Sequence, residues 1–184
     1  MKRACLSLLC VLCLLPLLRA QSLHQCKGFG AAAVQGKATV ASPLEDLYDI
    51  SHIRFQLHMS DTSAYIAGSV TTTARAVAAM SQYAFELDTA LTIDSVTING
   101  IRTPVSSAGI VHTATLPTPT DSGTTFAAQV YYHGHPWKEW EVWQPGLHCD
   151  SDVHITFTIS EPYYALRWWP CKQSVTDKAD SVDM

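Results

Sequence analysis

Apolar and polar side chains alternate with a period of two through most of the chain after residue 44. In 53–59 the apolar residues are Ile, Phe, Leu and Met at every second position, and 153–159 repeats the pattern. Because successive side chains of a strand point to opposite faces, this alternation predicts half-buried strands. We count about seven or eight short strands and no convincing helix, since Ala74–Met80 is too short. The sequence therefore predicts an all-β fold, either an antiparallel β-sandwich or a saddle-shaped sheet.

Turn residues divide these strands. Asn99-Gly100 follows the apolar run 93–98, and both residue types tolerate a positive φ, so this dipeptide predicts a tight hairpin. A further strand, 111–116, is expected to end at Pro117, because proline cannot donate to a sheet ladder. Ordered structure is expected to begin near Leu44.

The first twenty residues resemble a targeting segment. Lys2 and Arg3 precede an almost wholly apolar stretch, 4–18, and Ala20 suits a cleavage site. This pattern predicts a signal peptide over 1–20 and an exported protein, periplasmic, surface-bound or extracellular. The small, polar residues 21–43 are expected to form a linker.

Charge and cysteine content narrow the class of partner. The net charge is -4, so the chain lacks the excess of positive charge that is typical of nucleic-acid-binding proteins. No second apolar run is long enough for a membrane span. Of six cysteines, those at positions 26, 149 and 171 lie outside the signal peptide, and their spacing leaves all three disulfide pairings open.

The region near the end of the chain carries the most specific pattern. The run Ser160–Lys172, with Glu-Pro at its start and Trp-Trp-Pro-Cys near its end, is followed by Asp177–Ala179. Together they resemble the signature that closes the N-terminal domain of aminopeptidase N family enzymes. Shorter similarities lie at 48–50, 68–71 and 96–100. The chain departs from the family where Arg167 is displaced by one position and where Lys-Gln stands in place of the Asp expected after the Cys.

The resemblance implies that this chain is one domain of a longer protein whose catalytic residues lie in another domain. It implies a β-domain over 44–160 and a junction segment over 161–184 that leads to a catalytic domain. The family's His-Glu-x-x-His zinc motif does not occur in this sequence, so we expect no catalytic residue, metal ligand or cofactor here. We expect the chain to be truncated before the zinc site of its full-length parent, and the isolated chain to be inactive.

Glu161 is the one site residue that the resemblance assigns. In the family, a Glu at this position reaches the catalytic cleft and binds the free α-amine of the peptide substrate. A carboxylate accepts charge-assisted hydrogen bonds from an ammonium group, which suits an enzyme that reads a free amino terminus. Spacing alone, without the surrounding signature, would favour a solvated loop carboxylate.

Two other groups of side chains, histidines and tryptophans, could have a functional role. His133 and His135 share a strand face and could bind a metal with His148, although a plain hairpin end is the favoured interpretation. The tryptophans at 137, 140 and 143 are expected to fold back onto the sheet. Trp168 and Trp169 are expected to form an exposed apolar patch facing the missing domain.

A second class of function fits the same sequence. An exported β-sandwich could act alone as a binding or adhesion module without catalysis. An open reading frame that continues into His-Glu-x-x-His would favour the aminopeptidase interpretation, and a stop codon would favour the module.

Overall fold

The structure is a computed structural model that describes residues 42–184, except 62, 137–143, 150–152, 159, 161–162 and 175. Its described residues form strands and two short 3-10 helices, which confirms the all-β prediction. The elements, in chain order, are η1 Pro43–Leu47, β1 Tyr48–His58, β2 Ile66–Ala76, β3 Met80–Glu86, β4 Leu91–Ile98, β5 Ile101–Thr103, β6 Val105–Ala108, β7 Val111–Thr120, β8 Thr125–Gly134, β9 Gln144–Cys149, β10 Val153–Phe157, η2 Ala165–Arg167 and β11 Ser181–Asp183.

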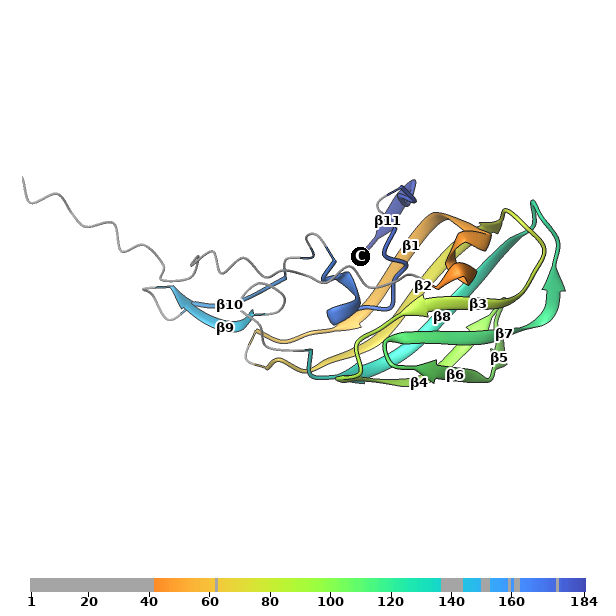
Figure 1. Cartoon of the computed structure of the whole chain (residues 1–184). Helices are drawn as coiled ribbons and strands as arrows, with labels where there is room; N and C mark the ends of the chain where they lie inside the picture. Colours follow the sequence, from red (N-terminus) through yellow and green to blue (C-terminus); the bar gives the residue numbers. More distant parts are fainter. Residues whose placement is uncertain are drawn as a thin grey trace, which may run out of the picture. The chain divides into compact units, whose positions relative to one another are not determined.

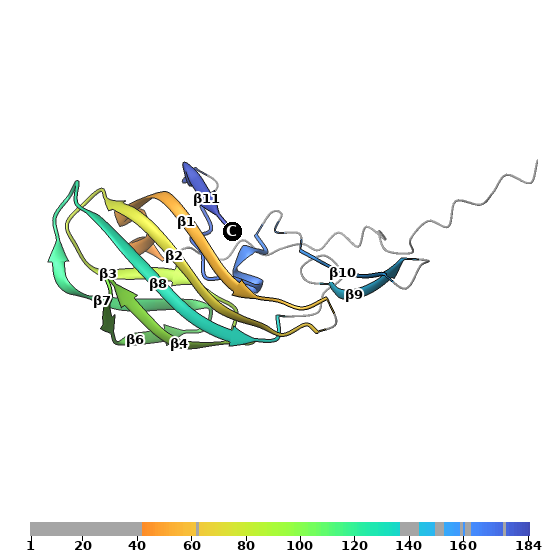
Figure 2. The ribbon, with the colours of Figure 1, turned by 180° about the vertical axis from the view of Figure 1, so that it is seen from behind.

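Two sheets form the sandwich. The larger has the strand order β11-β1-β2-β8-β4-β5, and the smaller has the order β3-β7-β6. Figures 1 and 2 view the molecule from opposite sides and show the smaller sheet covering one face of the larger. Neighbouring strands are antiparallel except β11, which pairs with β1 in parallel. Strands β9 and β10 form a separate antiparallel pair.

The core lies between the two sheets. Tyr48 and Phe126 belong to the larger sheet, and Tyr83 belongs to the smaller one. The centroid of the Tyr83 ring lies 5.1 Å from that of the Tyr48 ring and 5.8 Å from that of the Phe126 ring. Because all three are buried, their contacts join the sheets through apolar surface removed from water.

The hairpin prediction is confirmed, and one predicted strand end is wrong. Asn99 and Gly100 connect β4 to β5 with φ of 51° and 80°. Strand β7 does not stop at Pro117 but continues to Thr120. The register between β3 and β7 shifts between Met80 and Gln82, opposite this part of β7. An irregularity of the ladder tolerates proline because no N–H is required there. Within the described residues, no helix is long and apolar enough to cross a membrane.

Candidate functional site

The closing segment, residues 160–184, lies against both sheets. Cys171 exchanges backbone hydrogen bonds with Glu86 of β3, at N–O distances of 2.7 and 2.9 Å. The Tyr132 hydroxyl of β8 donates to the Trp168 carbonyl over 2.9 Å. Strand β11 then extends the larger sheet beside β1. The segment is therefore fixed to the sandwich at several separated points.

An ion pair anchors the middle of this segment. Arg167, in η2, pairs with the Asp88 carboxylate, which is buried in the turn between β3 and β4. The Asp88 amide donates to the Leu166 carbonyl over 2.9 Å, and the Ala90 amide donates to Asp88 Oδ1 over 2.8 Å. Arg167 and the Ala90 amide thus give the buried carboxylate the partners that burial demands. The displaced Arg167 thus holds η2 against the β3–β4 turn.

Glu161, the predicted substrate-binding residue, lies outside the described residues. The residues on either side of it have defined contacts. The Tyr164 amide donates to the Ser160 carbonyl over 3.2 Å, and the Trp168 indole Nε1–H donates to Ser160 Oγ over 3.0 Å. Ser160 and Tyr164, which lie on either side of Glu161 in the sequence, are therefore joined to each other by a hydrogen bond.

The expectation of an exposed Trp168–Trp169 patch is wrong. The Trp168 side chain is only 6% exposed, and Trp169 is partly buried against the same core. Phe55 of β1 stacks on Trp168 and meets Trp169 edge to face. The reason is that the segment folds back over β1, which supplies the apolar cover that no nearby sequence provides. Trp168 also borders a groove of about 330 Å³ whose apolar lining includes Met59, Phe157 and Met184.

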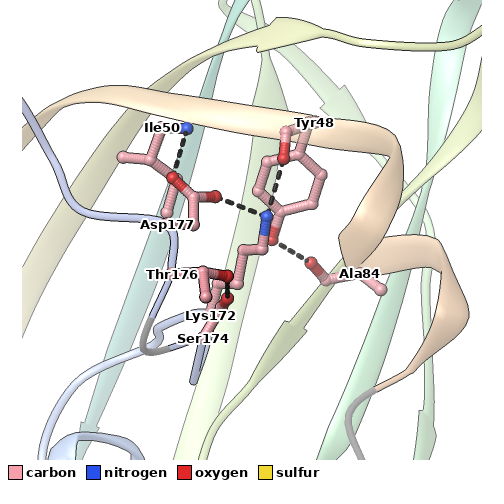
Figure 3. A network of polar contacts seen from close by, with 7 residues as sticks. All are labelled: Tyr48, Ile50, Ala84, Lys172, Ser174, Thr176 and Asp177. Atoms are coloured by element: carbon pink, nitrogen blue, oxygen red, sulfur yellow. Dashed lines mark hydrogen bonds and ion pairs between the residues drawn. The ribbon is translucent and has the colours of Figure 1, made fainter.

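A second polar network follows Cys171 (Figure 3). Lys172 pairs with Asp177, donates to the Tyr48 carbonyl over 2.7 Å and lies 4.6 Å from the centre of the Tyr48 ring. The Ile50 amide donates to Asp177 Oδ1 over 3.1 Å, and the Tyr48 hydroxyl donates to the Ala84 carbonyl over 2.8 Å. Sequence reasoning noted Lys172 only as a departure from the family pattern. Its spacing from Asp177 was the signal that could have revealed the pair.

Two further carboxyl groups are buried next to this network. Burial, then the charge of Glu86, raises the pKa of Glu45 to about 7. Burial also raises the pKa of Glu86, although a hydrogen bond from Gln173 opposes this change. Cys171 has a free, buried thiol, and burial raises its pKa well above the ordinary value. Disulfide pairings that use Cys171 are thus absent from this structure.

His133 and His135, for which a metal site was the less favoured interpretation, have other partners. His133 Nδ1 lies 2.9 Å from a carboxylate oxygen of Asp94, and the rings of His133 and His135 both contact Tyr65. Among the residues that the structure describes, no three His, Cys, Asp or Glu side chains gather into a metal-binding group. The tryptophans at 137, 140 and 143 lie outside the described residues.

Comparison with solved structures places the fold. No protein-family model and no curated protein matches the chain. A two-domain M1 zinc metallopeptidase bound to L-tryptophan is similar at 21% identity, with a TM-score of 0.65, over 78% of this chain and 33% of that chain. The Deinococcus radiodurans M1 zinc metallopeptidase bound to a Tyr-Ser-Ala substrate is similar at 22% identity, with a TM-score of 0.62, over 73% and 32% of the two chains.

Leukotriene A4 hydrolase from Saccharomyces cerevisiae is similar at 14% identity, with a TM-score of 0.59, over 73% of this chain and 22% of that chain. The chain spans about a third or less of the structures that it matches. At these identities the likeness shows a shared fold. The resemblance to zinc peptidases of the aminopeptidase N type is confirmed at that level.

Proposed function

We propose that this chain is the N-terminal β-domain of an exported zinc aminopeptidase and forms one wall of the cleft that binds the peptide amino terminus. The observation that carries the proposal is the fold match to the M1 zinc metallopeptidase, at a TM-score of 0.65 over about a third of that protein. The sequence signature from Ser160 to Lys172 also supports it.

Glu161 is the proposed substrate-binding residue. A carboxylate in a partly dry cleft accepts charge-assisted hydrogen bonds from an α-ammonium group. A peptide with a blocked terminus leaves that carboxylate without its partner, and this loss disfavours the blocked peptide. The carboxylate thereby selects exopeptidase substrates without taking part in bond cleavage.

The contacts around Ser160 and Arg167 support this role. A group that reads an ammonium ion must be held within a narrow range of positions, and rigid neighbours provide that restriction. The Trp168 indole donates to Ser160 Oγ, and Arg167 pairs with the buried Asp88, so described residues before and after Glu161 in the sequence are held in place. We assign these residues to positioning rather than to substrate contact.

The proposal places the zinc ligands and the hydrolytic chemistry in a catalytic domain that acts with this chain. The matched structures are zinc metallopeptidases of which this chain covers about a third, which supports that division. The signal-like residues 1–20 support export of the protein. A peptide amino terminus is the proposed ligand of the shared cleft.

Competitive inhibition of the zinc-containing protein tests the proposal. L-tryptophan and N-acetyl-L-tryptophan are compared as inhibitors of wild type, Glu161→Gln and the control Asp121→Asn, whose residue is exposed in the β7–β8 turn. Loss of the whole charged hydrogen bond, about 1.5–3 kcal/mol, corresponds to about ten- to a hundred-fold in affinity, and Glu161→Gln, which keeps an acceptor oxygen, should lose a smaller part of this affinity for L-tryptophan, while the control loses none. The acetylated compound should be unaffected. Equal changes for both compounds, or none, would reject the role of Glu161.

A further inference from the structure

Two carboxylic acids are buried where the closing segment meets the sandwich. Glu45, in η1, is 1% exposed, and Glu86, in β3, is fully buried. Neither oxygen of Glu45 has a hydrogen-bond partner in the described structure, and neither has Glu86 Oε1. An ionised carboxylate in such a place costs several kcal/mol unless it is paired. At most one of these two acids can be charged at low cost.

Among the described residues, the charged groups that act on these acids do not provide a free cation. Lys172 is the basic group that acts on Glu45, and it already binds Asp177 and the Tyr48 carbonyl. The other titratable groups that act on this cluster come from every element around it: Asp46 of η1, Tyr48 of β1, Tyr83 of β3, and Cys171 and Asp177 of the closing segment. Burial raises the pKa of the tyrosines and of the thiol, which stay neutral. One lysine thus faces several acids.

Glu86 binds the closing segment directly, and Glu45 acts on it through the charge of Lys172. Glu86 exchanges both backbone hydrogen bonds with Cys171, and its Oε2 accepts a hydrogen bond from Gln173 Nε2 over 2.6 Å. Helix η1 leads directly into Tyr48, whose carbonyl binds Lys172. A change in charge at either acid therefore acts on the contacts that fasten residues 171–177.

We propose that Glu45 and Glu86 hold one proton between them and form a pH-sensitive latch that fastens residues 171–177 to the sandwich. With one acid neutral, the pair is compatible with a dry site, and the Glu86–Cys171 bridge stays closed. When this one remaining proton leaves, both carboxylates are charged and repel each other in a site away from water. Opening of the bridge admits water and relieves the repulsion. The inference does not rest on the proposed peptidase function.

The direction of the pH dependence of the latch follows from the raised pKa of Glu45. Burial raises the pKa of Glu45 from 4.5 to about 7, so the closed latch binds this proton more tightly than the open one. Its stabilising effect is complete below pH 4.5 and is lost as the pH rises through 7. A shift of this size makes opening about fifty- to a hundred-fold more frequent at pH 8.5 than at pH 5.

Hydrogen exchange of the full chain tests the latch. The reporters are the amides of Glu86 and Cys171, with the central β8 amide of Val130 as an internal reference. After correction for intrinsic exchange, protection of the reporters should fall about fifty- to a hundred-fold from pH 5 to pH 8.5 in wild type. In Glu45→Gln it should change less than about threefold, while Asp121→Asn should behave as wild type. A pH-independent reporter in wild type, or the same pH dependence in Glu45→Gln, would overturn the proposal.

A second measurement needs no variant that must fold. Carbon-13 labelling of glutamate carboxyl groups in wild type gives the titration midpoint of each side chain directly. One carboxyl resonance should titrate near pH 7, well above the ordinary value of about 4.5. If every glutamate of the chain titrates near its ordinary value, no proton is retained by the pair and the proposal is rejected.

Discussion

The ring of Trp168 stacks on the ring of Phe55, with centroids 5.8 Å apart and planes inclined by 15°. Phe55 lies in β1, and Trp168 follows η2 in the closing segment. This contact makes the closing segment part of the hydrophobic core of the sandwich. The segment that carries the family signature therefore contributes to folding as well as to the proposed site.

Replacement of Trp168 by Ala should destabilise the protein strongly. The change removes a buried aromatic side chain, its stacking on Phe55 and its hydrogen bond to Ser160, and such truncations cost about 3–5 kcal/mol. Urea unfolding measures the free energy of unfolding of the variant and of Tyr131→Ala, an exposed aromatic control that should lose less than about 1 kcal/mol. Similar losses in the two variants would place Trp168 outside the core.

Two glycines should respond very differently to alanine. Gly68 has φ of +148°, and a Cβ there would lie 2.1 Å from the Gln56 carbonyl oxygen of the neighbouring strand. Gly109 has φ of +66°, and a Cβ there would meet nothing within 4 Å. We expect Gly109→Ala to cost about 1–2 kcal/mol through backbone strain alone, and Gly68→Ala roughly 3 kcal/mol or more, because β1 and β2 must separate. Equal unfolding free energies in urea would contradict the close approach of the two strands at Gly68.

Stability should also depend on His112 at acid pH. The His112 ring lies between Ser107 Oγ at 2.8 Å and the Leu87 carbonyl at 3.1 Å, and burial lowers its pKa below 6.5. The unfolded chain then binds this proton more readily, so the stabilising effect of neutral His112 is present above pH 6.5 and is lost as the pH falls below it.

The difference in unfolding free energy between wild type and His112→Gln isolates this effect. It should shrink as the pH is lowered from 7.5 to 5, whereas the difference for the exposed control Gln56→Ala, which has no ionisable group, should stay constant. A constant difference for His112→Gln would mean that the ring is not buried as a neutral group.

Strands with a clear alternation were predicted from sequence, and those without it were not. The run 53–59 lies within β1 except for its last residue, and Asn99-Gly100 gave the correct hairpin. The strands β5 and β6 are short and mostly exposed, so no buried face imposes a period of two on them. Strand β11 was not predicted for the same reason, because all three of its residues are exposed.

The contacts of the closing segment depend on residues far apart in the chain. Arg167 and Asp88 are 79 residues apart, and Gln173 and Glu86 are 87 apart. Spacing along one sequence cannot indicate which distant partners a fold brings together. The motif at 160–172 therefore identified the segment, while the ion pair and the two buried acids became visible only in three dimensions.

Peptide selectivity of the zinc-containing protein measures directly whether Glu161 binds the substrate amine. The measurement is kcat/KM of wild type, Glu161→Gln and Glu161→Ala on Tyr-Ser-Ala and on its N-acetylated form. We expect a loss of about ten- to a hundred-fold on the free peptide for Glu161→Ala, a smaller loss for Glu161→Gln, and little loss on the acetylated peptide, with zinc content unchanged. An equal loss on both peptides, or full activity of Glu161→Ala on the free peptide, would contradict it.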